Sequence, residues 1–231
     1  MNALTVVHHG KAVRLKAPEG TYSYYHPAHV FTGLGWDAQT SSLLLTDRID
    51  SILILGLGGG TVARQCRTLF PNALIVGVER DRRVIGFAFR KFALGSINVK
   101  VVAMNGEAYL RKTAHRFDGI IDDMWLPNSP DLKPVLLDRR WPELVRSRLT
   151  PRGVYAVNLY NRSEYPSHVK TARSRLTGTF PSLREVSPGP GETTVIASGV
   201  SLSTPREARS RLRQLPTTLA QNLNHVRFRT L

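Results

Sequence analysis

Residues 51–66 read SILILGLGGGTVARQC and join an apolar run, a cluster of glycines and a helical pattern. The run Ser51–Leu55 is typical of a strand buried on both faces. The glycines that follow permit a tight turn and let a ligand approach the backbone; they are Gly56, Gly58, Gly59 and Gly60. Thr61–Phe70 predicts the next helix, whose first N–H groups would face that ligand.

Strand and helix patterns continue to alternate after this segment. The predicted strands are Ala73–Val78, Asn98–Val102, Phe117–Asp122 and Val154–Leu159, and the predicted helices are residues 82–92, Glu107–Thr113, Arg139–Leu149 and Ser167–Leu176. Residues 182–199 predict a hairpin around a Pro/Gly turn. The alternation indicates an α/β fold with a mostly parallel seven-stranded sheet, an antiparallel edge strand and helices on both faces.

The chain divides into three predicted parts. Residues 1–49 predict a small segment of strands and loops that covers the site, and the aromatic stretch from Tyr22 to Trp36 is interpreted as loop and short turns. Residues 50–199 predict the Rossmann-like domain. Residues 200–231 predict a basic helical tail, with a capping box formed by Thr204 and Glu207.

Composition narrows the class of protein. The 231 residues are 42% hydrophobic and 21% charged, which are globular values. The sequence contains neither a membrane-spanning apolar run nor a signal-peptide pattern, so we expect a cytoplasmic location. Cys66 is the single cysteine, which excludes an internal disulfide and favours a small core residue.

A formal net charge of +15 makes a nucleic-acid partner one alternative. The densest basic cluster is Arg206, Arg209, Arg211 and Arg213. An acidic small molecule or an acidic protein would respond to the same electrostatic field. We therefore expect a small-molecule acceptor first, with nucleic acid as an open alternative and no membrane partner.

Glu79 ends the second predicted strand, shortly after the glycine turn. A carboxylate at that point accepts hydrogen bonds from both hydroxyls of a ribose. The glycine turn and Glu79 together therefore predict a nucleoside site. A dinucleotide site would favour a glycine at position 61, where this chain has Thr61.

Acidic residues also follow the next two strands. Glu107 follows the third strand, and Asp122 and Asp123 end the fourth. Ligands of open α/β sheets bind outside the carboxyl ends of the strands. This convergence favours S-adenosylmethionine or its decarboxylated form over a nicotinamide dinucleotide.

Four segments resemble the spermidine-synthase-like branch of the class I methyltransferase fold: ILILGLGGGTVARQ, IVGVERD, NGEA and FDGIIDDMWLP. The resemblance covers roughly residues 51–199. It implies that Gly56, Gly58 and Gly60 line the cofactor, that Glu79 binds the ribose and that Glu107 contacts adenine. It also places Asp123 on the family's catalytic acid, whereas Gly59 and Leu126 stand where the family carries aspartates.

The chemistry expected at this site is displacement at a carbon attached to a sulfonium. An amine nucleophile must lose a proton, and Asp123 is the expected acceptor, with Asp122 beside it. Trp125, Tyr160 and His26 are candidates to line the acceptor pocket. We expect no metal.

The sequence leaves three functions open. We favour methyl transfer from S-adenosylmethionine by a spermidine-synthase-like enzyme. The first alternative is a divergent polyamine aminopropyltransferase that uses decarboxylated S-adenosylmethionine. The second is a basic nucleic-acid-binding protein with a relict nucleoside pocket. A homodimer is a further open possibility, because the related enzymes commonly pair.

Overall fold

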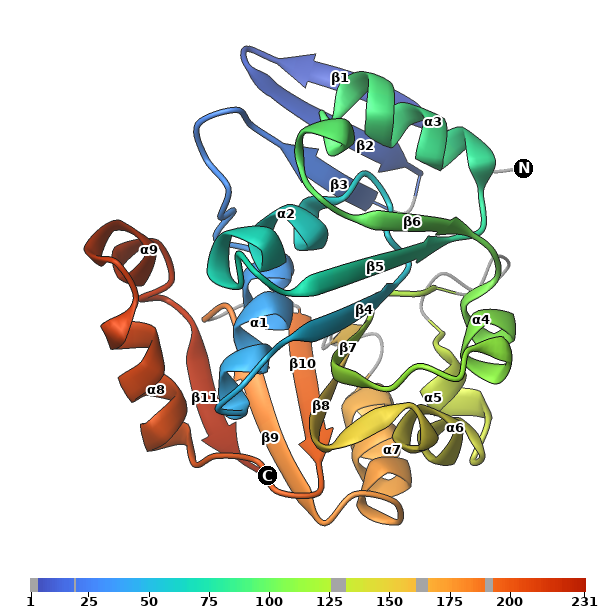
Figure 1. The fold of residues 1–231 in the computed structure, drawn as a ribbon, viewed down its shortest axis with the longest axis vertical. Helices are drawn as coiled ribbons and strands as arrows, with labels where there is room; N and C mark the ends of the chain where they lie inside the picture. The colour runs from blue at the N-terminus through green and yellow to red at the C-terminus, as the bar shows by residue number, and fades with distance from the viewer. Residues whose placement is uncertain (1–3, 19, 126–131, 161–165, 190–192) are drawn as a thin grey trace.

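An eight-stranded sheet forms the centre of the molecule in the computed structural model, which describes residues 4–18, 20–125, 132–160, 166–189 and 193–231 (Figure 1). The strand order is β11-β9-β10-β8-β7-β4-β5-β6. Its strands are β4 (Ser51–Leu55), β5 (Leu74–Glu79), β6 (Lys100–Ala103), β7 (Phe117–Asp122), β8 (Leu149–Tyr160), β9 (Ser182–Ser187), β10 (Thr193–Gly199) and β11 (Arg227–Thr230). Strands β6, β5, β4, β7 and β8 run parallel, and β10, β9 and β11 are added antiparallel.

The mostly parallel α/β fold is confirmed, but two details of the sheet differ from the prediction. The sheet has eight strands within the described residues, because residues 227–230 of the expected helical tail form β11. The antiparallel part therefore holds three strands, with β11 at the edge. The sequence of β11 gives only a weak strand signal, because Phe228 is its one apolar residue and the one buried residue of the four.

The N-terminal part forms a separate three-stranded sheet of β1 (Thr5–His9), β2 (Ala12–Ala17) and β3 (Gly20–Tyr25). It packs on α3 (Arg82–Lys91), where Val13 and Leu15 of β2 share an apolar cluster with Val84 and Phe92 (Figure 1). Asp81 caps α3 by accepting a hydrogen bond from the N–H of Arg83.

The stretch from Tyr22 to Trp36 was wrongly interpreted as loop throughout. It contributes the end of β3 and the start of α1 (Gly35–Ser41), which runs into a 3-10 turn, η1 (Ser42–Leu45). The polar residues of α1 leave no amphipathic pattern that would predict a helix from the sequence. Asp37 is nevertheless fully buried and accepts hydrogen bonds from the N–H and hydroxyl of Thr32. The helix is held by these partners rather than by an amphipathic pattern.

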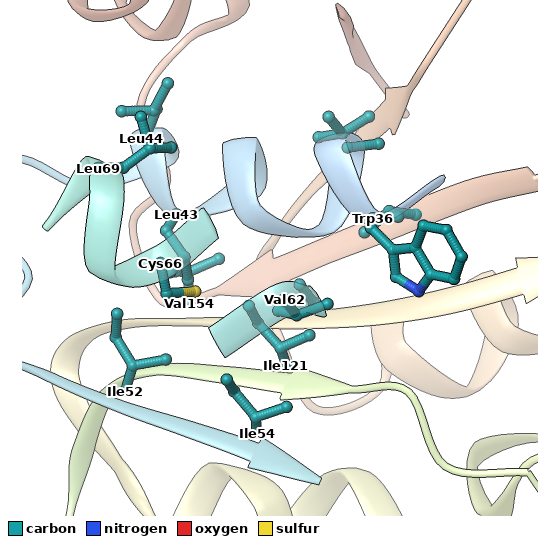
Figure 2. Close-up of a cluster of buried hydrophobic side chains, with 14 of the residues drawn as sticks. Trp36, Leu43, Leu44, Ile52, Ile54, Val62, Cys66, Leu69, Ile121 and Val154 are labelled. Carbon is teal, nitrogen blue, oxygen red and sulfur yellow. The ribbon is translucent and has the colours of Figure 1, made fainter. Parts of the chain in front are cut away.

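Helices cover both faces of the main sheet. On one face lie α1, η1, α2 (Thr61–Leu69) and α8 (Pro205–Gln214), and Figure 2 shows Trp36, Val62 and Cys66 among the buried side chains there. On the other face lie α4 (Gly106–Lys112), α5 (Pro134–Leu137), α6 (Trp141–Ser147) and α7 (Pro166–Thr177). Cys66 is a core residue as expected, and burial raises the pKa of its thiol to about 12.

The C-terminal residues dock against the main domain through α8, α9 (Thr217–Asn222) and β11. The capping box of Thr204 and Glu207 is present. Two arginines of the basic cluster serve this docking: Arg209 donates to the carbonyl of Phe228, and Arg211 donates to the carbonyl of Leu44. No helix of the described segments is long and apolar enough to cross a bilayer.

Candidate functional site

The glycine turn between β4 and α2 is built from backbone alone. The N–H groups of Gly56 and Leu57 both donate to the carbonyl oxygen of Val78, at 3.0 Å each. Gly56 has φ +85°, and a Cβ there would lie 2.8 Å from the carbonyl oxygen of Asp123. Only glycine fits at position 56, because the turn lies directly against the end of β7.

Glu79 points at this turn from the end of β5. Its Oε2 accepts the N–H of Gly58 at 3.0 Å, and its Oε1 accepts the N–H of Asp81 at 3.0 Å. Burial raises the pKa of Glu79, while these backbone hydrogen bonds lower it. The structure therefore brings Glu79 and the glycine turn together, as the sequence predicted; their role in binding a nucleoside stays a prediction.

Strand β3 covers the glycine turn through side-chain contacts that the sequence did not identify. The Oγ of Ser23 accepts the N–H of Gly59 at 2.6 Å. Two residues later, the Oγ1 of Thr61 accepts the N–H of Tyr24 at 2.8 Å and donates to the carbonyl of Tyr24 at 2.9 Å. A Cβ at position 59 would lie 2.8 Å from the Cβ of Ser23, so the N-terminal sheet fills the space beside Gly59.

Asp122 belongs to a fully buried polar network. Its Oδ2 accepts the hydroxyl of Tyr155 at 2.7 Å, and that hydroxyl also accepts the indole N–H of Trp141 at 3.1 Å. The Nζ of Lys133 lies 3.8 Å from its Oδ1. Asp122 therefore already has a cation and a hydroxyl as partners, which is typical of a structural role.

Lys133 is a site residue that the sequence did not reveal. It is fully buried, donates to the carbonyls of Asp122 at 3.2 Å and Met124 at 2.7 Å, and lies 4.0 Å from the ring centre of Trp125. Burial lowers the pKa of Lys133, and the two aspartates raise it. Its contacts fix the chain directly after β7. A lone lysine between prolines and leucines carries no sequence signal for this role.

Asp123 faces different partners from Asp122 and is only half-buried. Its Oδ1 accepts the side-chain N–H of Asn158 at 2.8 Å, and its own N–H donates to the carbonyl of Leu55. Burial raises the pKa of Asp123, whereas Lys133, Asn158 and Gln39 lower it. A carboxylate of raised proton affinity at the end of β7 is suited to accept a proton from a substrate.

Glu107, His26 and Tyr160 are the remaining side chains that the sequence predicted for the site. Glu107 lies in the first turn of α4 and pairs with Arg111 at 2.8 Å on the helix surface, so its contact with adenine stays a prediction. His26 stacks on His29 with ring centres 4.5 Å apart, and its Nδ1 accepts the N–H of Ala28. The side chain of Tyr160 and the whole of Leu126 lie outside the described residues.

The chain matches a known protein family and several named relatives. A family model described as the spermine/spermidine synthase domain matches residues 40–186, more than half of the chain. A probable polyamine aminopropyl transferase of Bifidobacterium longum (strain NCC 2705) is 29% identical over 143 residues, which are 62% of this chain. The aligned region spans only 31% of that relative.

Two solved structures share the fold. A probable spermidine synthase from Corynebacterium glutamicum ATCC 13032 aligns with a TM-score of 0.77 at 14% identity, over 99% of this chain and 88% of the other. Human methyltransferase-like protein 13 in complex with SAH aligns with a TM-score of 0.62 at 22% identity, over 81% of this chain and 87% of the other. At these identities the likeness establishes the fold alone.

Proposed function

Since the chain belongs to the spermine/spermidine synthase domain family, we propose that it is an aminopropyltransferase that uses decarboxylated S-adenosylmethionine and an amine acceptor. The family match and the named B. longum relative support this alternative over the methyl transfer that the sequence favoured. The support for methyl transfer is limited to the shared fold. The observation that carries the proposal is the placement of Glu79 and Asp123 on either side of one glycine turn.

The glycine turn and Glu79 fit the sugar of an adenosine. A carboxylate offers about four lone-pair positions, and the two backbone N–H groups that Glu79 accepts leave others for hydroxyl donors. The Gly56 backbone, held against Asp123, presents no side chain to a ligand at this point. Glu79 would hold the ribose, and the turn would place the rest of the molecule towards β7.

When bound, the decarboxylated cosubstrate supplies an electrophilic carbon next to a sulfonium. The amine nitrogen forms a bond to that carbon while the carbon–sulfur bond breaks, and the sulfur keeps the electron pair. Asp123 accepts the proton that the amine releases, because its raised pKa gives it more affinity for a proton than an exposed aspartate has. Lys133 and Asn158 hold Asp123 and its neighbours in place during this step.

Product analysis tests this proposal. Purified protein is incubated with an amine mixture and either decarboxylated or ordinary S-adenosylmethionine. We expect methylthioadenosine from the first reaction and no S-adenosylhomocysteine from the second, and Asp123→Asn should slow the first reaction about a hundredfold or more, as for loss of a general base. S-adenosylhomocysteine formed in an acceptor-dependent manner would overturn the proposal in favour of methyl transfer.

A further inference from the structure

The outer face of α8 carries a stripe of three arginines. Arg206, Arg209 and Arg213 follow one another at spacings i, i+3 and i+7, which places their side chains on one side of the helix. The opposite side of α8 packs on the main sheet through Ala208 and Leu212, the two buried residues of the helix. All three arginines are exposed. The fold therefore presents most of the basic cluster seen in the sequence to solvent, as an ordered row that we call the α8 stripe.

Most of the hydrogen-bond donors of the α8 stripe are unused. Arg209 gives one N–H to the carbonyl of Phe228 at 2.9 Å, and its guanidinium carries several more. Arg206 and Arg213 form no side-chain hydrogen bond or ion pair within the part of the chain that the structure describes. A guanidinium binds a phosphate or a carboxylate through two parallel N–H groups. The stripe is therefore suited to bind a ligand with a row of oxyanions.

The acidic residue nearest to the α8 stripe in the sequence is already engaged. Glu207 is the single acidic residue among residues 200–231. Its Oε2 accepts the N–H and the hydroxyl of Thr204 at 2.7 Å and 2.9 Å, which holds the carboxylate in the capping box at the start of α8. The charge of the stripe also adds to the net charge of +15 on the whole chain. The electrostatic field around α8 therefore attracts polyanions.

The chemistry of α8 favours a phosphate backbone over an acidic protein. The helix exposes no large apolar side chain, whereas the centre of a protein–protein interface is apolar. The helix also has no aromatic residue on which an unpaired base could stack, so a single strand gains less than a duplex does. From Arg206 to Arg213 the helix rises about 10 Å, or about three phosphate steps along one strand of a duplex.

We propose that the α8 stripe binds the phosphate backbone of a nucleic-acid duplex without reading its sequence. Each guanidinium donates to phosphate oxygens, and binding releases the counterions condensed on the duplex. The stripe is separate from the glycine turn, because α8 packs on η1, which precedes β4, whereas the turn follows β4. Figure 1 shows α8 beside α9 and β11 at the outside of the molecule. The inference is therefore independent of the proposed function.

Fluorescence anisotropy on the full chain measures the affinity for a labelled duplex of about 20 base pairs between about 50 and 200 mM salt. The test variant is Arg206→Gln with Arg213→Gln, whose thermal melt should match wild type because neither side chain has a bond to lose. Loss of two phosphate contacts should lower the slope of log K against log salt by about 2 and weaken binding about tenfold or more.

Two control proteins separate the stripe from the charge of the whole chain. Lys112→Gln with Arg173→Gln removes the same charge from exposed positions of α4 and α7, on the other face of the sheet, and should keep the wild-type slope. Arg206→Lys with Arg213→Lys keeps the charge of the stripe and should also keep the slope. Its affinity should fall, because an ammonium cannot bind a phosphate through two parallel N–H groups.

Each outcome supports or overturns the proposal. Duplex DNA and duplex RNA are tested in separate arms, and stripe-dependent binding of either one supports it. Equal salt slopes of wild type and the Arg206→Gln, Arg213→Gln protein overturn it, and so does equal weakening by this variant and the Lys112→Gln, Arg173→Gln control. Wild-type protein that binds polyglutamate or a single strand more tightly than a duplex also overturns it. Formation of methylthioadenosine is measured separately, so either proposal can fail while the other stands.

Discussion

Replacing Gly59 by aspartate restores the family's residue at a position where Ser23 and Phe92 occupy the space beside the backbone. The backbone permits the change, because Gly59 is not among the glycines with positive φ. A Cβ at position 59 would, however, lie 2.8 Å from the Cβ of Ser23 and 3.0 Å from two ring carbons of Phe92. Ser23 and Phe92 are each 1% exposed, so neither side chain has open space to move into.

The expected cost follows from these contacts. Overpacking a well-packed site costs about 1–3 kcal/mol, and displacing Ser23 would also break its hydrogen bond with the N–H of Gly59, worth about 1 kcal/mol. We expect Gly59→Asp to lose about 3 kcal/mol, which lowers the Tm of a chain this long by roughly 6–12 °C. Urea denaturation and a thermal melt measure both quantities.

Two further variants control this experiment. Gly178→Asp should be within about 0.5 kcal/mol of wild type, because its nearest neighbour would be 3.7 Å from the new Cβ. Combining Gly59→Asp with Ser23→Gly should recover part of the loss, since the closest contact is removed. A Gly59→Asp protein as stable as wild type, or a double mutant with purely additive losses, would refute the argument that the N-terminal sheet occupies the aspartate's place.

Three titratable groups, Asp123, Lys133 and Cys66, give further expected outcomes. The pKa of Asp123 is raised in the folded protein, so the wild type loses stability as the pH rises from 3.8, the ordinary pKa of an aspartate, through the folded pKa. Asp123→Asn should therefore gain stability relative to wild type over this pH range, as measured by urea denaturation. A stability difference that stays constant with pH would contradict this prediction. Lys133→Met leaves Asp122 buried without its cation and should cost about 3 kcal/mol, whereas an unchanged urea midpoint would show that this cation is dispensable. Cys66, with a pKa of about 12, should not react with a thiol reagent in native buffer at pH 8, and labelling at the rate of a free thiol would show that it is exposed.

The backbone of the main domain was predictable because its signals are local. Apolar runs mark β4 and β5, since a strand covered on both faces needs no polar side, and Ile120 and Ile121 mark β7 more weakly. Asp81 and Thr204 mark helix starts because a cap acts within three residues. The position of Glu79 at the end of its strand was visible for the same reason.

The remainder of the site depends on contacts between distant segments. Ser23 reaches Gly59 across 36 residues, and Gln39 of α1 lies beside Asp123 at the end of β7. Lys133 is buried although lysine is normally exposed, because backbone carbonyls and Trp125 replace its water. No periodicity in the sequence encodes such pairings, so they appear only once the fold is known.

Glu79 and the glycine turn are expected to hold one adenosine sugar. Calorimetry with methylthioadenosine on wild type, Glu79→Ala and the exposed control Glu143→Ala addresses it most directly. We expect Glu79→Ala to bind about tenfold to hundredfold more weakly while Glu143→Ala binds as wild type does, because hydrogen bonds to a charged group are worth about 1.5–3 kcal/mol. Equal affinity of all three proteins, or no binding by the wild type, would contradict the account.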